Sequence, residues 1–165
     1  MRNIAFGYSN RCNIKCEHCV AADEHVSFSK MELDLAKEAI KELTGAGVTG
    51  ISFTAGEPTI YLDDLLELLE ICRQLKIYTR VVTNSYWASD PEKVMETVMR
   101  LQNSGLNQLR LSFSRWHQQI VDKSNVGKAA LACQKIELDY FVSFVTDVTS
   151  HDDVYEDYLR EQNLV

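Results

Sequence analysis

The chain has 165 residues, of which 45% are hydrophobic and 25% are charged, and its formal net charge is −7. This length suits a single domain with a substantial core, and no apolar run is long enough to span a membrane. Acidic residues outnumber basic ones, and the basic residues form no stripe, which argues against a large nucleic-acid interface.

The N-terminal sequence and the cysteines bear on the location of the protein. The first ten residues, MRNIAFGYSN, lack the apolar core of a signal peptide, so we expect a cytoplasmic protein. Thiols stay reduced in that compartment, and the five cysteines are an odd number, so a disulfide framework is not expected. Cys72 and Cys133 lie alone in helix-like segments and are expected to be small buried residues.

Short apolar strands alternate with amphipathic helices along the chain. The expected strands are residues 3–8, 51–54, 77–83, 109–113 and 140–146. The expected helices between and after them are residues 29–45, 63–75, 90–105, 126–136 and 150–159. Strands separated by helices pair in parallel through right-handed crossovers, so this pattern predicts an α/β protein with one parallel sheet and helices outside it.

Start and stop signals refine these helices. Ser29-Lys30-Met31-Glu32 reads as a capping box with Ser29 as N-cap, and Ser89 or Asp90 is expected to cap the helix that Pro91 begins and Gly105 ends. Ser150 is expected to cap the last helix, with the acidic run at residues 151–157 as a solvated face. The expected inner faces include Met31, Leu35, Ala39 and Leu43 in the first helix and Val154, Tyr158 and Leu159 in the last.

Four polar segments each follow a predicted strand. They are the cysteine loop after the first strand, then residues 56–58, 84–85 and 114–117. In sheets of this kind ligands collect at the carboxyl ends of the strands. We therefore expect these four segments to share one rim and to form the binding site.

The cysteine loop has the sequence RCNIKCEHC and the spacing C-x3-C-x2-C, with Cys12, Cys16 and Cys19. Thiolates favour iron–sulfur clusters, zinc and copper(I). This spacing allows one loop to bind three irons of a cubane and leaves the fourth iron open to a small molecule. A structural zinc ion would need a fourth protein ligand, for which His25 is a candidate, whereas His18 is too constrained between two cysteines.

The C-x3-C-x2-C loop after the first strand resembles the radical S-adenosylmethionine (radical SAM) superfamily. The turn Ala55-Gly56-Glu57-Pro58 resembles the family's Gly-Gly-Glu-Pro turn after the second strand, with alanine for the first glycine. The resemblance covers nearly the whole chain as one core domain, residues 1–165. It implies a partial (β/α) barrel, an incomplete form of the family's (β/α)6 core that lacks the sixth βα unit.

The resemblance also implies a reaction and its cofactors. A 4Fe-4S cluster on Cys12, Cys16 and Cys19 would bind S-adenosylmethionine at its open iron. One electron, from a donor such as flavodoxin or ferredoxin, would cleave the sulfonium to methionine and a 5′-deoxyadenosyl radical. That radical abstracts hydrogen from a substrate, which the sequence does not identify.

Further roles follow position by position from the resemblance. Gly56 and Glu57 would meet the methionine amino group, largely through backbone carbonyls. Asn84 resembles the asparagine of a Thr-Asn-Gly turn after the third strand, with Ser85 in place of glycine. Ser112 and Arg115 are candidates for the ribose hydroxyls and the methionine carboxylate, since an arginine fork binds both carboxylate oxygens.

The sequence also departs from the family pattern. His18 stands before the third cysteine, where an aromatic residue usually packs near the adenine, and a histidine can still stack there. His117 is either a substrate contact or a surface residue of a capped helix. No sixth strand follows the segment 140–146, which leaves an exposed edge that is expected to favour self-association.

Three functions remain open on the residues alone. The first is a radical SAM enzyme of unidentified substrate. The second is a non-catalytic iron–sulfur or electron-transfer module built on a truncated or partner-completed core. The third is a zinc-stabilised interaction domain with His25 as the fourth ligand. The Gly56-Glu57-Pro58 turn favours the first over the third, because a zinc site does not need that turn across the rim.

Overall fold

The computed structural model describes residues 2–19, 27–147 and 152–164. Its five strands form one parallel sheet in the order β1-β2-β3-β4-β5. The strands are β1 (Asn3–Phe6), β2 (Gly50–Phe53), β3 (Tyr78–Thr83), β4 (Gln108–Phe113) and β5 (Asp139–Phe144). Each strand therefore pairs with the next one in sequence, as the alternating pattern predicts, and the sheet is open rather than closed.

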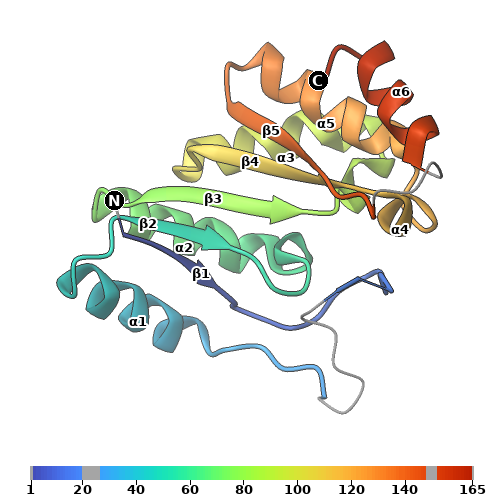
Figure 1. The fold of residues 1–165 in the computed structure, drawn as a ribbon. Coiled ribbons are helices and arrows are strands. Elements are labelled where there is room, and N and C mark those ends of the chain that lie inside the picture. The colour runs from blue at the N-terminus through green and yellow to red at the C-terminus, as the bar shows by residue number, and fades with distance from the viewer. Residues whose placement is uncertain (1, 20–26, 148–151, 165) are drawn as a thin grey trace.

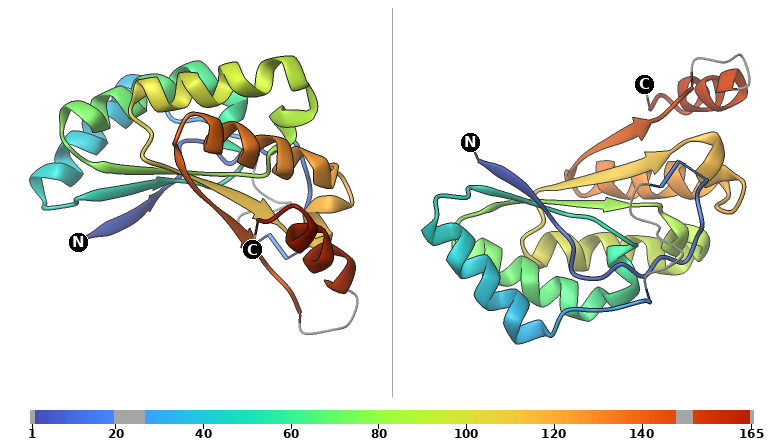
Figure 2. Two further views of the ribbon diagram at one scale, coloured as in Figure 1. Left: turned by 90° about the horizontal axis from the view of Figure 1, so that it is seen from above. Right: turned by 60° about the horizontal axis from the view of Figure 1, so that its bottom comes forward.

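Helices lie between successive strands, and one more follows the last strand (Figure 1). They are α1 (Leu33–Gly45), α2 (Leu62–Gln74), α3 (Pro91–Ser104), α4 (Arg115–Gln118), α5 (Lys123–Lys135) and α6 (Asp153–Glu161), with short 3-10 turns η1 (Pro58–Tyr61) and η2 (Tyr86–Ser89). Figure 2 shows α1, α2, α3 and α5 along one face of the sheet, while these helices leave the opposite face open. None of the described helices is long and apolar enough to cross a membrane.

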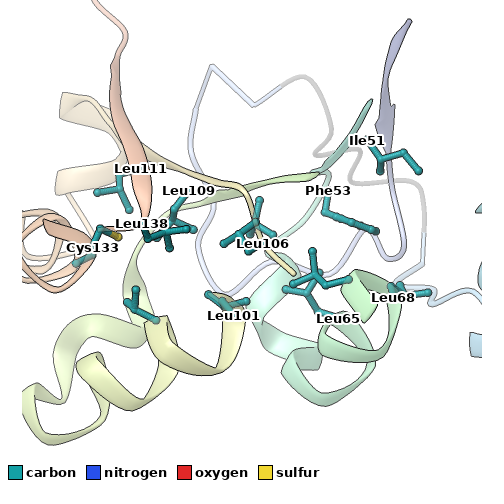
Figure 3. Packing of buried hydrophobic residues seen from close by; sticks show 14 of the residues in the cluster. Ile51, Phe53, Leu65, Leu68, Leu101, Leu106, Leu109, Leu111, Cys133 and Leu138 are labelled. Carbon is teal, nitrogen blue, oxygen red and sulfur yellow. The ribbon is translucent and has the colours of Figure 1, made fainter. Parts of the chain in front are cut away.

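The core lies between the sheet and the four long helices (Figure 3). Leu109, Leu111 and Phe113 alternate along β4 and are fully buried, as the strand pattern predicts. Opposite them, Leu68 of α2 and Leu101 of α3 are fully buried as well. Burying a side chain of this size stabilises the fold by about 2 kcal/mol. Cys72 and Cys133 are buried in this core, which confirms that they are packing residues.

The first helix begins later than the capping box predicts. It starts at Leu33, and neither Ser29 nor Glu32 caps it with its side chain. The Ser29 N–H instead donates to Asn10 Oδ1 at 2.8 Å, and Lys30 forms an antiparallel bridge with Ser9. The prediction was wrong because the segment before α1 is held by the cysteine loop, a contact between residues about 20 positions apart that no local motif reveals.

Three side chains lie differently from their predicted faces. Leu35 is 57% exposed, because Ala36 and Ile40 form the buried stripe of α1. Val154 is 66% exposed, whereas Leu159 is buried as predicted. Asp152, in the acidic run expected to be solvated, is only 4% exposed and stands at the N-cap position of α6. The predicted cap Ser150 lies outside the described residues.

The start and end of α3 agree with the sequence signals. Asp90 is the N-cap, and its side chain accepts a hydrogen bond from the Glu92 N–H. Pro91 is the first residue of the helix. Gly105 follows the helix in the left-handed conformation, with φ of 111°.

Candidate functional site

A cavity of about 520 Å³ opens at the carboxyl ends of the strands. The three clustered cysteines form part of its wall, and residues from the ends of β2, β3 and β4 form much of the rest. The predicted site residues that line it are Cys12, Cys16, Cys19, Gly56, Glu57, Asn84 and Ser112. The cavity therefore gathers segments that are far apart in the sequence at the rim that parallel strands share.

The cysteine loop is attached to the rest of the molecule on both sides. The Arg11 carbonyl accepts a hydrogen bond from the Glu57 N–H at 2.8 Å, which joins the loop to the turn after β2. Asn10 bonds the backbone of Ser29 on the other side. Burial raises the pKa of Cys16 to about 11, so this residue is a neutral thiol near pH 7. It must lose its proton when it binds a metal or cluster as a thiolate.

The donor set distinguishes a cluster from a single ion. In a zinc site the sulfurs all lie about 2.3 Å from one metal, whereas cluster thiolates bind separate irons. Across residues 2–19, 27–147 and 152–164, no three cysteine, histidine or acidic side chains gather closely enough to hold one ion. Three free thiols along one cavity wall therefore fit a cluster better than a zinc ion. The proposed zinc ligand His25 lies outside the described residues.

Gly56 lies at the closest approach between the turn after β2 and the cysteine loop. Its φ is +60°, and a Cβ at this position would overlap the carbonyl group of Arg11. Ala55 before it also has a positive φ, of 69°. Glycine at position 56 is thus required by contact with the cysteine loop, a reason that the turn motif alone does not reveal.

The side chain of Glu57 is buried and accepts four hydrogen bonds. One carboxylate oxygen accepts from the Thr59 N–H at 3.2 Å, from the Thr59 hydroxyl at 2.6 Å and from the Thr83 hydroxyl at 2.8 Å. The other accepts from the Asn84 N–H at 2.8 Å. Burial raises the pKa of Glu57, and these donors partly oppose that rise. The carboxylate therefore ties the turn after β2 to the end of β3.

Asn84 joins the end of β3 to the cysteine loop. Its Nδ2 donates to Asn13 Oδ1 at 2.8 Å and lies 3.8 Å from the Cys12 sulfur. Its Oδ1 accepts from the Tyr86 N–H at 2.9 Å. Ser85, which replaces the glycine of the resembling turn, has a φ of +63° and a buried hydroxyl without a partner among the described residues. Glycine adopts this backbone conformation more easily than serine does.

The two candidates at the end of β4 differ in their relation to the cavity. Ser112 lines the cavity. Arg115 is not among the lining residues: its guanidinium forms an ion pair with Asp147, lies 4.0 Å from Asp152 and covers the Trp116 ring. The buried Asp152 therefore lies beside a positive charge. The assignment of Arg115 to a methionine carboxylate stays a prediction.

Three rings pack together beside the third cysteine. The centroid of His18 lies 4.7 Å from that of Trp116 and 5.2 Å from that of His117. His117 Nδ1 lies 2.7 Å from the Ser114 hydroxyl, and His117 lines the cavity. Burial, and then the neighbouring His18, lowers the pKa of His117 to about 4, so this imidazole is neutral near pH 7.

Residues that were not predicted for the site from the sequence form the floor of the cavity. Arg110 and Ser143 line it from β4 and β5, together with Ser52 of β2. Their signal was present, because polar residues occupy the positions between Leu109, Leu111 and Phe113. A strand with one apolar face packs that face on the helices and turns the other towards the interior of the partial barrel.

Comparison with known proteins identifies related sequences. Residues 7–129 match the family model of the Radical SAM superfamily. YydG of Bacillus subtilis, named for peptide biosynthesis, is 25% identical over 126 residues, which are 76% of this chain and 40% of that protein. A PqqA peptide cyclase of Rhodopseudomonas palustris is 28% identical over 116 residues, 70% of this chain and 29% of that protein. The chain thus spans less than half the length of these relatives.

Solved structures share the fold. The structure of anSMEcpe with bound AdoMet has a TM-score of 0.70 at 20% identity, over 98% of this chain and 49% of that one. The methyltransferase TsrM from Kitasatospora setae, with cobalamin and a [4Fe-4S] cluster bound, has a TM-score of 0.68 at 15% identity, over 97% and 32%. Since the family model covers most of the chain, including the cysteine loop and the turn after β2, this chain belongs to the radical SAM superfamily.

Proposed function

We propose that this chain is the catalytic core of a radical SAM enzyme. The observation that carries the proposal is that Cys12, Cys16 and Cys19 line one cavity with Gly56, Asn84 and other residues at the strand ends. The three thiolates would hold a 4Fe-4S cluster. When bound, the cluster and S-adenosylmethionine supply the electron transfer that generates a 5′-deoxyadenosyl radical.

The protein's own residues would position this chemistry. The Gly56-Glu57 turn would present backbone groups to the methionine moiety, and the buried Glu57 carboxylate would keep that turn fixed against β3. Asn84 would hold the first cysteine in place through Asn13 and donate towards the Cys12 sulfur. Hydrogen bonds to sulfur are one means by which proteins tune cluster potentials.

Ser112 would bind S-adenosylmethionine from the end of β4, where it faces the cavity. Arg115 could reach the methionine carboxylate only by giving up its ion pair with Asp147. His18, whose ring packs against that of Trp116 at an angle of 33°, would lie near the adenine. These roles rest on the resemblance together with the lining of the cavity.

The substrate class and partners are proposed from the relatives. Two of them are named for peptide biosynthesis or peptide cyclisation, which favours a peptide substrate for the whole protein. A reduced flavodoxin or ferredoxin would supply the electron. A reducing, cytoplasmic location would keep the cysteines free for the cluster.

Anaerobic reconstitution with iron and sulfide, followed by an assay for 5′-deoxyadenosine, tests the function. We expect a brown, oxygen-sensitive protein whose reduced cluster changes its electron paramagnetic resonance spectrum on addition of S-adenosylmethionine. A triple variant, Cys12→Ala, Cys16→Ala and Cys19→Ala, should lose its iron, whereas the matched variants Cys72→Ala and Cys133→Ala should retain it. An unchanged spectrum with S-adenosylmethionine and no 5′-deoxyadenosine would favour a non-catalytic iron–sulfur module instead.

A further inference from the structure

The open face of the sheet carries rows of polar side chains that the proposed function does not yet use. The strand register places Ser52, Arg80, Gln108 and Asp139 side by side across β2 to β5. The next row along the strands consists of Val82, Arg110 and Phe141. Residues paired in register on parallel strands face the same side, so both arginines point into the interior of the partial barrel.

Neither arginine has an acidic partner in the part of the chain that the structure describes. Among the residues that the structure describes, no carboxylate lies within ion-pair distance of Arg80 or Arg110, although the chain as a whole carries a net charge of −7. Arg80 Nε donates to Gln108 Oε1 at 2.6 Å, and Arg110 Nη2 donates to the Ser143 hydroxyl at 2.6 Å. The side-chain partners of both guanidinium groups in these hydrogen bonds are therefore neutral.

The two guanidinium groups share an aromatic neighbour. They lie 5.2 Å and 5.4 Å from the centroid of the same ring, that of Phe141. Arg110 Nε is buried and has no hydrogen-bond partner among the described residues. Two half-buried guanidinium groups are less well hydrated than exposed ones. An anion that contacts both of them would therefore be bound more strongly than by two exposed arginines.

The nearby acidic residues are already engaged. Asp139 accepts a hydrogen bond from Gln108 at 2.6 Å, on the far side of that residue from Arg80. Glu57 lines the same cavity as Arg110 but accepts from Thr59, Thr83 and Asn84. Neither carboxylate therefore forms a direct ion pair with Arg80 or Arg110.

The position of Arg110 separates it from the cofactor rim. It precedes Ser112 by two residues on β4, so its Cα lies about 7 Å further into the barrel. It nevertheless lines the same cavity as the three cysteines. Arg80 lines an adjoining hollow of about 300 Å³, and Ser52 borders both spaces. An anion at Arg110 would thus lie in the space left for the substrate.

We infer that Arg110 and Arg80, which both contact the Phe141 ring, form a carboxylate-binding site that anchors an acidic group of the substrate. The identification of the bound group as part of the substrate rests on the proposed function. Binding of a carboxylate at the two arginines requires neither the cluster nor S-adenosylmethionine. A carboxylate is favoured because a planar guanidinium pairs with its two oxygens. For a peptide substrate the group would be a glutamate or aspartate side chain.

The test uses the 165-residue chain without its cluster, so that it does not depend on radical chemistry. The Arg110 Nε–H resonance is followed by nitrogen-15 NMR while N-acetyl-glutamate N-methylamide is added. The neutral probe N-acetyl-glutamine N-methylamide is the matched ligand control. We expect a saturable shift with the glutamate probe and binding at least tenfold weaker with the glutamine probe.

Variants assign the binding to the two arginines. With binding followed on backbone amides of β4 and β5, Arg110→Gln should abolish the shift and Arg80→Gln should weaken it. Arg100→Gln is the matched control, because Arg100 pairs with Asp63 outside the cavity. If Arg110→Gln fails to fold, Ser143→Ala replaces it: this variant removes only the hydroxyl partner and should bind the glutamate probe at least as tightly as the unaltered chain.

Four results would overturn the inference. They are equal binding of the two probes, no binding of either, tighter binding of inorganic phosphate than of the glutamate probe, and displacement of that probe by S-adenosylmethionine. The last would assign Arg110 to the methionine carboxylate. Failure of the proposed function would instead appear as absence of 5′-deoxyadenosine in reconstituted protein, with the probe still bound by the cluster-free chain.

Discussion

At the scale of single residues, Glu57 shows how one buried carboxylate can organise a binding site. Its four hydrogen bonds come from Thr59, Thr83 and Asn84, which lie in two different strand-end segments. Two of the donors are backbone N–H groups, one on each carboxylate oxygen, so both oxygens must act as acceptors. An unsatisfied buried donor is costly, which makes this position intolerant of an amide.

We predict that Glu57→Gln lowers the free energy of unfolding by about 2 kcal/mol at pH 7. A glutamine must turn its NH2 group towards either the Thr59 or the Asn84 N–H, which leaves that backbone donor unpaired. Urea denaturation followed by circular dichroism measures the change. Glu67→Gln is the control, because Glu67 is half exposed in an ion pair with Lys37 and should change stability by less than about 1 kcal/mol. A loss no larger than in this control would contradict the prediction.

The same carboxyl group predicts a dependence of stability on pH. Its pKa in the folded chain is raised by burial above the ordinary value of 4.5, so the folded state binds the extra proton between these two values. Its contribution to stability is therefore present below pH 4.5 and is lost as pH rises through the folded-state pKa. Denaturation curves should show that the free energy of unfolding falls less in Glu57→Gln than in the unaltered chain as pH rises through this range. An identical fall in both proteins would rule out Glu57 as its source.

At the scale of elements, the turns after β2 and β3 both use left-handed backbone conformations. Gly56 has φ of +60° and Ser85 has φ of +63°. The two turns converge on the cysteine loop, one through the Arg11 carbonyl and the other through Asn13. Their conformations therefore set the position of the first cysteine.

We predict that Gly56→Ala impairs cluster loading. The added Cβ would overlap the Arg11 carbonyl, and relief of this overlap requires the cysteine loop to move away from β2. Iron and sulfide content after reconstitution should fall at least several-fold. Gly45→Ala is the matched control, since a Cβ there meets nothing within 4 Å, and it should load normally. Full iron content in Gly56→Ala would show that the loop adjusts freely.

We predict that Ser85→Gly stabilises the chain. The change relieves a positive φ and removes a buried hydroxyl that lacks a partner among the described residues. Lys76→Gly is the control for the effect of glycine at a positive φ on the free energy of unfolding. Lys76 also has a positive φ, of 58°, but its side chain is exposed after α2. The gain should exceed that of Lys76→Gly by about 1 kcal/mol in urea denaturation, which is the cost of one unpaired buried polar group. A gain equal to or below the control would mean that the hydroxyl is satisfied.

At the scale of the whole molecule, the sheet remains open at both ends. β1 and β5 are its edge strands, and each pairs with one neighbour among the described residues. Unpaired edges are templates for association with another chain. The apolar Val145, just beyond β5, is 37% exposed. The chain also covers less than half of its relatives' length, so a longer chain would have further residues available to cover such an edge.

We predict that the 165-residue chain self-associates through the β5 edge. Light scattering on cluster-loaded protein should show a mass that rises with concentration. Val145 lies just beyond the edge strand, at the wall of the cavity. Val145→Lys should reduce the association, because a lysine charge beside an unpaired edge opposes pairing. Leu131→Lys is the control: Leu131 is 51% exposed on α5, away from the sheet edge, and its change should leave association unaltered. A stable monomer at high concentration, or equal effects of both variants, would argue against the edge.

The order of strands and helices, the ends of α3 and the gathering of four polar segments at one rim could all be predicted from the sequence. Each depends on local signals, such as alternating apolar residues on β4, Asp90 before Pro91, and the three-cysteine spacing, which act within a few residues. The motif resemblance likewise located the family without knowledge of the fold.

Other features arise only when distant segments meet. Ser29 binds the cysteine loop instead of capping α1, Asp152 is buried beside Arg115, and Arg110 faces the cavity together with Ser143. These contacts depend on sheet register and on helix rotation about its axis, where a shift of one residue moves a side chain to another face. Local periodicity does not specify that choice, because the energy that selects it comes from packing between elements about 20 to 40 residues apart.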